Sequence, residues 1–413
     1  MTIWILTLLL VLSLAGLGYR QGAIRVAFSL VGIFFGVLLA VPLSGPMTFV
    51  LKAFGAKNPV VLWLVPPFVA FCVISAIFKS IALAVHHKVE VHFRYKAGDL
   101  RFSLWERLNR RLGLCLGIVN GVAYSVILSF VIYSLGYWLV QLETSDGLNL
   151  PARLVTRGAK DLQSSGFVKS ARALDGMPAS YYEAADVAGL VFQNSLLEAR
   201  LARYPAFLML AERPEFQSLG SDTTFSEMRA RKDSIQQVLN YEPAQAIVKD
   251  PDTLREIWSV AEPDLKDLNA YLHSGVSEKY AEEPILGRWN FDARGTVAAM
   301  RRANPNMTSL QMARARRTVQ TLYAKTQVVM GIGGKAVIKN WPDLAAAAAP
   351  VAPGTEPAPT PMLSGTGDWD GGAGFYKVGF NVSGNDFKGT AAIEGERMTV
   401  TLDKLTVAFE REY

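Results

Sequence analysis

The sequence predicts an α+β membrane protein with four transmembrane α-helices, an α-helical middle region, and a C-terminal antiparallel β-sheet or partial barrel with a helical insertion. Three observations support this fold class. Residues 112–140 run without a charge, which is enough to cross a bilayer core of about 30 Å. Residues 142–284 place apolar side chains at helical spacing among frequent charges. Beyond residue 285, aromatic and polar side chains alternate between turn signals, as in short antiparallel strands.

Composition bounds the protein class. The chain has 413 residues, more than one hydrophobic core usually serves, so several domains are expected. The net charge of +6 is modest, and its densest run lies beside the predicted membrane segments. This charge therefore indicates membrane topology rather than nucleic-acid binding. The two cysteines, Cys72 and Cys115, both fall in predicted membrane helices and form no disulfide framework.

The first domain, residues 1–141, contains the four predicted spans. The segment 42–58 between the second and third spans is interrupted by Pro and Gly and favours a short interfacial element. Pro66 and Pro67 are expected to kink the third span, because neither has a backbone N–H to donate. The four spans are predicted at about residues 3–18, 23–41, 59–85 and 112–140.

Basic residues set the expected orientation. A predicted loop over residues 86–111 carries seven Lys and Arg side chains and lies on the same side as the turn near Arg20 and Arg25. Positive residues favour the cytoplasmic face of a membrane. The sequence therefore predicts cytoplasmic loops at 18–25 and 86–111 and an extracytoplasmic C-terminal region. The basic loop is also expected to contact anionic lipid headgroups or a cytoplasmic partner.

Glycine spacing marks the predicted helix-packing faces. Small residues four apart let membrane helices approach closely. Intramolecular packing of the four spans is the plainer interpretation, and a homo-oligomer interface is the alternative. The glycines at this spacing are Gly32, Gly36, Gly113, Gly117 and Gly121.

Two stretches carry a family resemblance. The segments GYRQGAIRVAFSLVGIFFGVLLA and RLNRRLGLCLGIVNGVAYSVILSF resemble the two signatures of the colicin V production protein (CvpA) family, over residues 1–140 only. The matching basic residues are Arg20, Arg25 and Arg111, but the acid that usually follows the first-turn basic residue is absent. The resemblance implies a multi-pass bacterial inner-membrane protein acting in toxin production or export, or in envelope maintenance. It implies no established reaction.

The remaining chain divides into two predicted regions. Residues 142–284 form an α-helical soluble region, several of whose helices begin at a proline. Residues 285–413 form a β-rich domain, interrupted by an Ala/Pro-rich linker at 342–364. The order of tryptophan strand, helices and strand meander is loosely similar to lipocalin-like domains.

Aromatic residues of the predicted strands are expected to form the core of the sheet. A sharper alternative is that they line a hydrophobic ligand cavity. The candidate cavity residues are Trp289, Trp369, Phe375, Phe380, Phe387 and Phe409.

The sequence offers no persuasive catalytic, cofactor or metal site. The histidines of HHKVEVH are interpreted as interfacial residues, because neighbouring Lys and Arg would repel a cation. The GIGGK stretch at 331–335 lacks the hydroxyl residue of a phosphate-binding loop and is interpreted as a hairpin turn.

The expected function is therefore non-enzymatic, with an extracytoplasmic region that binds a partner or ligand. Membrane lipid and an envelope protein, peptide or lipid are the expected partners, and no nucleic acid is expected. One alternative is an oligomeric transporter or channel component with Asn120, Ser125 and Ser129 facing a wet path. Another is an envelope enzyme on the β domain, with carboxylates such as Asp368 and Asp370.

Overall fold

A computed structural model describes residues 2–55, 59–96, 98–142, 150–343, 360–402 and 405–412. The chain divides into two compact units. Unit 1 comprises residues 1–193 and 228–256, and unit 2 comprises 194–227 and 257–413. The predicted boundary at 141/142 therefore falls inside unit 1, and most of the predicted Ala/Pro-rich linker lies outside the described residues.

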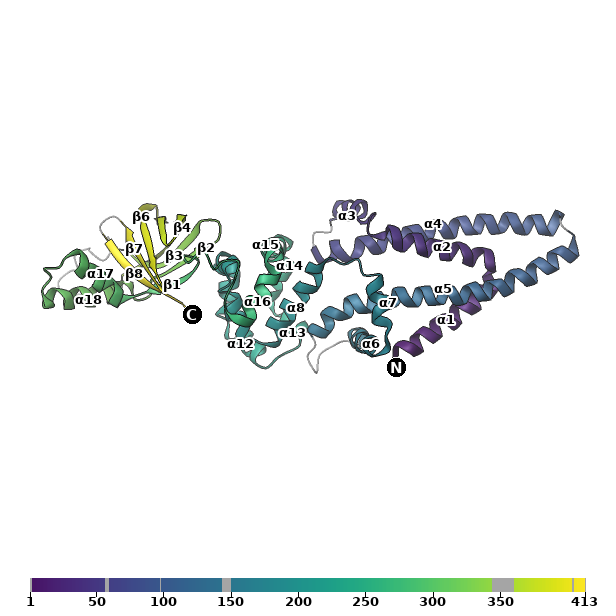
Figure 1. Ribbon diagram of the computed structural model, residues 1–413, viewed down its shortest axis with the longest axis horizontal. Helices are drawn as coiled ribbons and strands as arrows, with labels where there is room; N and C mark the ends of the chain where they lie inside the picture. Colours follow the sequence, from purple (N-terminus) through teal and green to yellow (C-terminus); the bar gives the residue numbers. More distant parts are fainter. Residues whose placement is uncertain are drawn as a thin grey trace. The chain divides into compact units, whose positions relative to one another are not determined.

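Unit 1 is built on long apolar helices (Figure 1). Four of them are long and apolar enough to cross a membrane, over Ile3–Gln21, Ala23–Ala40, Val65–Lys96 and Asp99–Gln141. Helix α1 packs along α5, whereas α2 packs against both α4 and α5. Their full bounds are α1 Thr2–Gln21, α2 Ala23–Ala40, α4 Pro59–Lys96 and α5 Asp99–Gln141.

The predicted loop at 86–111 is wrong. Helix α4 continues to Lys96 and α5 begins at Asp99, so nearly all of this basic stretch is helical. An aromatic cluster holds the two helices together here, since Trp105 stacks on Phe93 with ring centroids 5.3 Å apart. The segment expected to be interfacial contains a further helix, α3 Ser44–Ala53. Helix α4 also runs through Pro66 and Pro67 without ending.

Shorter helices complete unit 1. Leu162 of α6 is fully buried and packs in one cluster with Ile3 of α1 and Ile132 of α5. The described helices here are α6 Leu150–Ser165, α7 Phe167–Ala173, α8 Ala179–Gln193, α13 Ile235–Asn240, α14 Glu242–Lys249 and α15 Pro251–Ala261. Helix α8 ends at Gln193, and Asn194 and Ser195 separate it from the next helix, α9.

Unit 2 begins with short helices, several of which start at a proline that needs no backbone donor there. They are α9 Leu196–Leu201, a 3₁₀ turn Pro205–Phe207, α10 Leu208–Ala211, α11 Pro214–Gly220, α12 Thr223–Ala230, a second 3₁₀ turn Glu262–Asp264, and α16 Leu265–Ser274. Helix α12 crosses the boundary between the units.

The C-terminal domain is a closed eight-stranded antiparallel barrel (Figure 1). The predicted partial barrel is therefore complete: β1 pairs with β2 on one side and with β8 on the other. The helical insertion, α17 Ala293–Ala303 and α18 Ser309–Tyr323, lies between β1 and β2. The strands are β1 Gly287–Phe291, β2 Gln327–Gly331, β3 Lys335–Pro342, β4 Met362–Gly372, β5 Phe375–Val382, β6 Asn385–Glu394, β7 Arg397–Leu402 and β8 Leu405–Arg411.

Buried and exposed side chains alternate along the strands, and the buried ones fill the interior of the barrel. On β5, buried Tyr376, Val378, Phe380 and Val382 alternate with more exposed residues. Inward glycines allow the strands to coil, because a Cβ at Gly367 would collide with the backbone of β5. The interior is thus a packed core.

Candidate functional site

The three glycines of α5 that were expected at a helix interface lie where α5 meets α1. A Cβ at Gly117 would be 2.5 Å from the carbonyl oxygen of Leu14, and one at Gly121 would be 2.7 Å from the Cα of Val11. Gly113 faces the backbone of Gly18 just as closely. This face of α5 is therefore covered by α1 of the same chain.

The two glycines of α2 face α4. A Cβ at Gly32 would be 2.8 Å from the Cβ of Phe78, and one at Gly36 would be 2.8 Å from the ring of Phe71. Each glycine therefore makes room for one phenylalanine ring of the neighbouring helix.

The three basic residues of the family-like segments differ in how far they are exposed to solvent. Arg20 is in the last turn of α1 and is exposed, and Arg111 is exposed on α5. Arg25 is in the first turn of α2 and is partly buried, with no hydrogen-bond partner for its Nε among the described residues.

The structure does not gather the six aromatic residues proposed for a ligand cavity around one cavity, although Trp369, Phe380 and Phe387 are among the residues that line the cleft over β4, β5 and β6. Trp289, Phe380 and Phe409 are each at most 2 % exposed and belong to the packed barrel core. Phe375 is 75 % exposed on β5 and points away from that core. Trp369 and Phe387 are partly buried beside it. The expected core position is confirmed for Trp289, Phe380 and Phe409 and is wrong for Phe375, which lies on the exposed face of β5.

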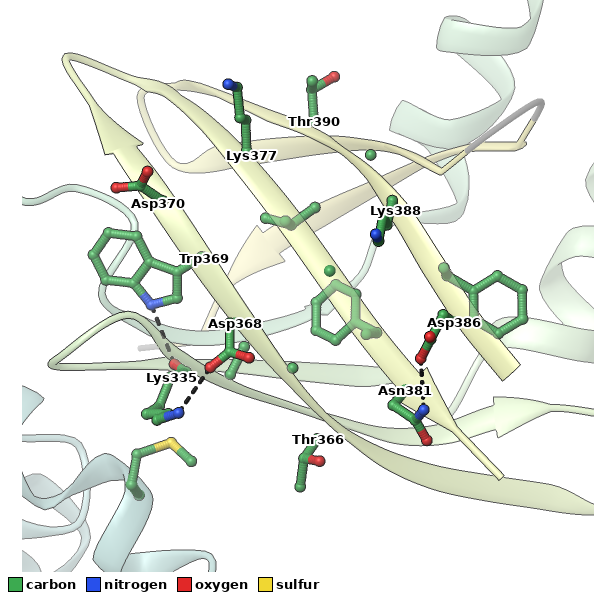
Figure 2. A pocket seen from close by; sticks show the side chains of 18 residues that line it. Lys335, Thr366, Asp368, Trp369, Asp370, Lys377, Asn381, Asp386, Lys388 and Thr390 are labelled. Carbon is green, nitrogen blue, oxygen red and sulfur yellow. Dashed lines mark hydrogen bonds and ion pairs between the residues drawn. The ribbon is translucent and has the colours of Figure 1, made fainter. Parts of the chain in front are cut away.

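The barrel does carry a large cleft on the outer face of β4, β5 and β6 (Figure 2). Its volume is about 1070 Å³, and Met209 of α10 lies at its border. The lining side chains that point outward are polar, and they come from alternate positions of the three strands. They are Thr366, Asp368, Asp370, Lys377, Asn381, Asp386, Lys388 and Thr390.

The strand register arranges these polar side chains in rows. One row runs from Lys335 through Asp368 and Gly379 to Lys388. Gly379 has no side chain, so the row leaves a gap at its centre, between the carboxylate of Asp368 and the ammonium group of Lys388. Charges of both signs therefore face one recess.

Some of these groups are already paired. The ammonium of Lys335 lies 2.8 Å from Asp368, and the amide of Asn381 donates to Asp386 at 2.6 Å (Figure 2). In the part of the chain that the structure describes, Asp370, Lys377 and Lys388 make no hydrogen bond or ion pair through their side chains. These three charged groups are available to a ligand.

A buried carboxylate fastens α10 to the barrel near this cleft. The side chain of Glu212, 4 % exposed, lies 2.8 Å from the guanidinium of Arg288 on β1 and also pairs with Lys339 on β3. Close by in sequence, Met209 packs directly on Gly331 at the end of β2. The position of α10 beside the cleft is therefore fixed by charge and by packing.

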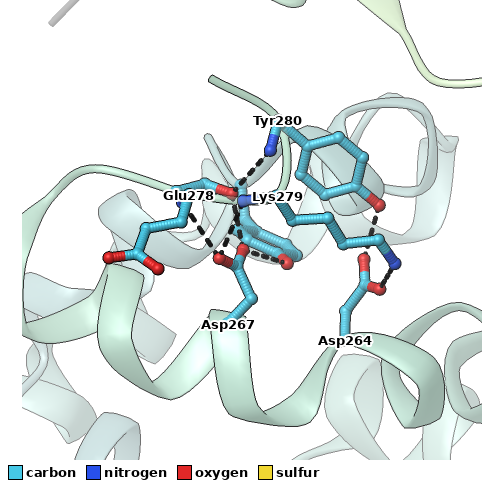
Figure 3. A network of polar contacts seen from close by, with 7 residues as sticks. Asp264, Asp267, Glu278, Lys279 and Tyr280 are labelled. Atoms are coloured by element: carbon cyan, nitrogen blue, oxygen red, sulfur yellow. Dashed lines mark hydrogen bonds and ion pairs between the residues drawn. The ribbon is translucent and has the colours of Figure 1, made fainter. Parts of the chain in front are cut away.

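A second polar network fixes the segment that leads into the barrel (Figure 3). Asp267 accepts hydrogen bonds from Ser277, from the hydroxyl of Tyr204 and from the backbone amides of Glu278 and Lys279. Burial raises the pKa of this carboxyl, but these donors more than offset it and hold the pKa below the ordinary value of 3.8.

The neighbouring carboxylate Asp264 is 3 % exposed. It pairs with Lys279 and accepts a hydrogen bond from the hydroxyl of Tyr280 at 2.5 Å. Burial, reinforced by this hydrogen bond, raises the pKa of Tyr280 above its ordinary value. Both aspartates therefore act on the connecting segment 277–280 and not on the cleft.

The polar residues considered for a conduction path are packed between helices. The hydroxyl of Ser125 donates to the carbonyl of Gly121, and that of Ser129 donates to the carbonyl of Ser125. Asn120 is also buried, and its Oδ1 has no partner in the described ranges. The structure thus buries all three of these side chains of α5.

Other candidate motifs take ordinary structural places. The histidines of HHKVEVH lie along α4, and the described residues contain no group of three or more His, Cys, Asp or Glu side chains placed to hold a metal. The glycines of the GIGGK stretch form the turn between β2 and β3.

Sequence reasoning missed the polar cleft, although a signal for it exists. Polar side chains occupy every second position over 366–370 and 386–390, and Lys377 and Asn381 lie on either side of Gly379 at the same spacing. That period identifies one face of each strand. It does not reveal that the three faces adjoin, which depends on the pairing of β4, β5 and β6.

Comparison with known proteins identifies no relative. No protein-family model, curated protein or solved structure matches the chain.

Proposed function

We propose that this chain is a non-enzymatic binding protein anchored in the bacterial inner membrane, of the colicin V production type. Its β-barrel would bind a polar segment of an envelope protein or peptide during export or envelope maintenance. The observation that carries the proposal is the cleft over β4–β6, with Asp370, Lys377 and Lys388 at its surface and no partner for their side chains among the described residues. Opposite charges set in one recess favour a partner with complementary charges and fix its register.

Membrane anchoring is supported by the four long apolar helices. The basic residues of the α4–α5 hairpin favour the cytoplasm for that end of the helices. The even number of spans, with both hairpins turning at basic segments, then puts the barrel outside the cytoplasm. A binding surface in that compartment would meet secreted or envelope-resident proteins.

Photo-crosslinking in cells tests this function. A photoreactive amino acid replaces Thr390, beside Lys388 and Lys377 in the cleft, or Arg302, which is exposed on α17. We expect a discrete crosslinked partner from position 390 and none of that mass from position 302. The charge reversals Lys377→Glu and Lys388→Glu should weaken the crosslink, because they invert the charges that the partner meets.

Two outcomes contradict the proposal. The partner crosslinks equally from both positions, or the double reversal leaves the crosslink at full strength. A reporter that is active only outside the cytoplasm, fused after the last residue, tests the location separately. Silence of that reporter in a chain that fractionates with membranes would contradict the extracytoplasmic barrel.

A further inference from the structure

Unit 1 contains a pocket of about 390 Å³ that the proposed function does not use. Its walls come from α2, α4 and α5, and its end wall comes from the segment that follows α7. Its lining includes Ala40, Val41, Phe68, Val131, Ser134 and Leu135.

The chemistry of the pocket excludes a polar ligand. Ser134 is the single residue with a polar side chain among those that line it, and its hydroxyl already donates to the carbonyl of Val131 at 3.3 Å. A polar group placed here would lose its water and gain no hydrogen bond, which is unfavourable. The pocket therefore suits hydrocarbon.

The pocket is continuous with the outer apolar surface of the helices. Phe68 at its rim is 63 % exposed, Val41 is 54 % exposed and Leu135 is 39 % exposed. In a chain whose helices cross a bilayer, this surface meets lipid tails. Hydrocarbon can then enter sideways without crossing a polar layer.

The dimensions match one leaflet. Along α5, the lining residues run from Ile127 to Leu135, a rise of about 12 Å at 1.5 Å per residue. Half of a bilayer core is about 15 Å. The pocket also lies beside the last turn of α2, which ends at Ala40, and so near one membrane surface.

The end wall is held in place by hydrogen bonds. Asp175 accepts from the backbone amide of Met177 at 3.0 Å and from the hydroxyl of Tyr182 at 2.8 Å. Between them, Gly176 approaches Val41 so closely that an added Cβ would be 3.1 Å from its Cγ2. The pocket is thus a recess with a fixed floor, unlike a simple gap between helices.

We infer that this pocket holds one acyl chain of a bilayer phospholipid, taken from the leaflet next to the α7–α8 segment. This inference rests on the proposed membrane anchoring. The bound chain would fill the space between α2, α4 and α5 and would join the spans to the segment at residues 174–177.

Native mass spectrometry of the full-length protein tests the inference. The protein is reconstituted in phosphatidylglycerol vesicles, extracted in detergent and exchanged into lipid-free detergent, and retained phospholipid is counted per chain. The wild type should retain one phospholipid. Ala40→Trp fills the pocket from α2 and should lower retention about tenfold or more, because the indole ring occupies the space that the acyl chain would fill.

Matched controls lie on the same helices. Leu38→Trp places the same ring at a position of α2 that is 57 % exposed and outside the pocket. Val131→Phe fills the pocket from α5, and Val122→Phe makes the same change at a position that is 51 % exposed. Both controls should retain lipid as the wild type does. Lipid retention is compared only for pocket variants whose circular dichroism spectrum matches that of the wild type.

The two proposals fail in different ways. A wild-type chain that does not float with the vesicles contradicts membrane anchoring. A chain that floats but retains no phospholipid overturns the acyl-chain site alone. Retention in folded Ala40→Trp and Val131→Phe equal to that of their controls overturns it as well.

Discussion

The hydroxyl of Tyr204 donates a hydrogen bond of 2.8 Å to the carboxylate of Asp267. Tyr204 is fully buried just before the first 3₁₀ turn of unit 2, and Asp267 lies in α16. The same carboxylate accepts two backbone amides of the segment that leads to β1. One side chain therefore joins three parts of unit 2 that are distant in sequence.

We expect Asp267→Asn to destabilise this junction by about 2 kcal/mol, because hydrogen bonds to a charged acceptor are worth about 1.5–3 kcal/mol each. Hydrogen exchange measured by mass spectrometry on the full-length protein should show faster exchange at residues 277–280. Asp370→Asn, which removes an exposed carboxylate that has no partner within the described ranges, is the control. Equal exchange in both variants would contradict a central role for Asp267.

The same carboxylate gives the junction a pH dependence. Its pKa in the folded protein is held below 3.8 by its hydrogen-bond donors. Its stabilising contribution is therefore complete above the unfolded value of about 4 and is lost as pH falls through the lower folded value. After correction for intrinsic exchange rates, protection at 277–280 should fall in acid in the wild type and fall less in Asp267→Asn.

The Glu212 ion pairs predict a larger effect. Glu212→Ala leaves Arg288, whose side chain is 14 % exposed, without its acidic partner, and breaking a buried pair costs about 3–5 kcal/mol. The midpoint for urea unfolding of the barrel should drop clearly. Asp368→Ala, which breaks the exposed pair with Lys335, should shift the midpoint far less, since exposed pairs contribute about 0–1 kcal/mol. A similar shift in the two variants would contradict the burial argument.

The contact between α1 and α5 is tested by Gly117→Val. Its added atoms would meet the backbone of Leu14 and Ala15, so we expect a loss of about 1–3 kcal/mol or more. Gly16→Val on α1 is the control, because a Cβ there meets nothing within 4 Å. Thermal unfolding in detergent should separate the variants. A homo-oligomer that dissociates in Gly117→Val while the thermal midpoint is unchanged would favour the intermolecular alternative.

Two of the aromatic residues that the sequence suggested for one cavity should differ strongly in their contribution to the stability of the barrel. Trp289→Ala should destabilise the barrel by about 3–5 kcal/mol, because it empties a fully buried site that also supports the guanidinium of Arg411. Phe375→Ala should change stability by about 0.5 kcal/mol or less, since that ring is 75 % exposed. Urea unfolding measures both. Comparable losses would mean that Phe375 is part of the core.

Sequence patterns located most of the elements of this fold. Hydropathy identified the four long helices, because an apolar run of that length is a strong signal. The prediction failed for residues 86–111, because their charges were interpreted as a sign of a loop. Charged residues such as Arg101 and Arg107 are equally compatible with an exposed helix. Alternation identified the strands after residue 285, but closure depends on β8 reaching β1. No local pattern encodes that pairing.

The candidate site was less accessible to sequence reasoning. Attention to aromatic residues led to the barrel interior, where Trp289 and Phe380 are simply core. The polar side chains of the cleft lie on the opposite face of the strands, and Gly379 leaves a gap among them because it has no side chain. The pocket in unit 1 combines four segments whose apolar residues look like any lipid-facing surface.

Closure of the barrel also sets the order in which its strands can pair during synthesis. Phe291 near the start of the domain pairs with Phe409 near its end, so the first strand stays half-bonded until the last has been synthesised. Such distant pairing makes folding slow. Until then β1 and β7 present open edges, which are prone to join other chains. The nascent domain would need protection during this interval, and its outer surface becomes usable only when its final strand arrives.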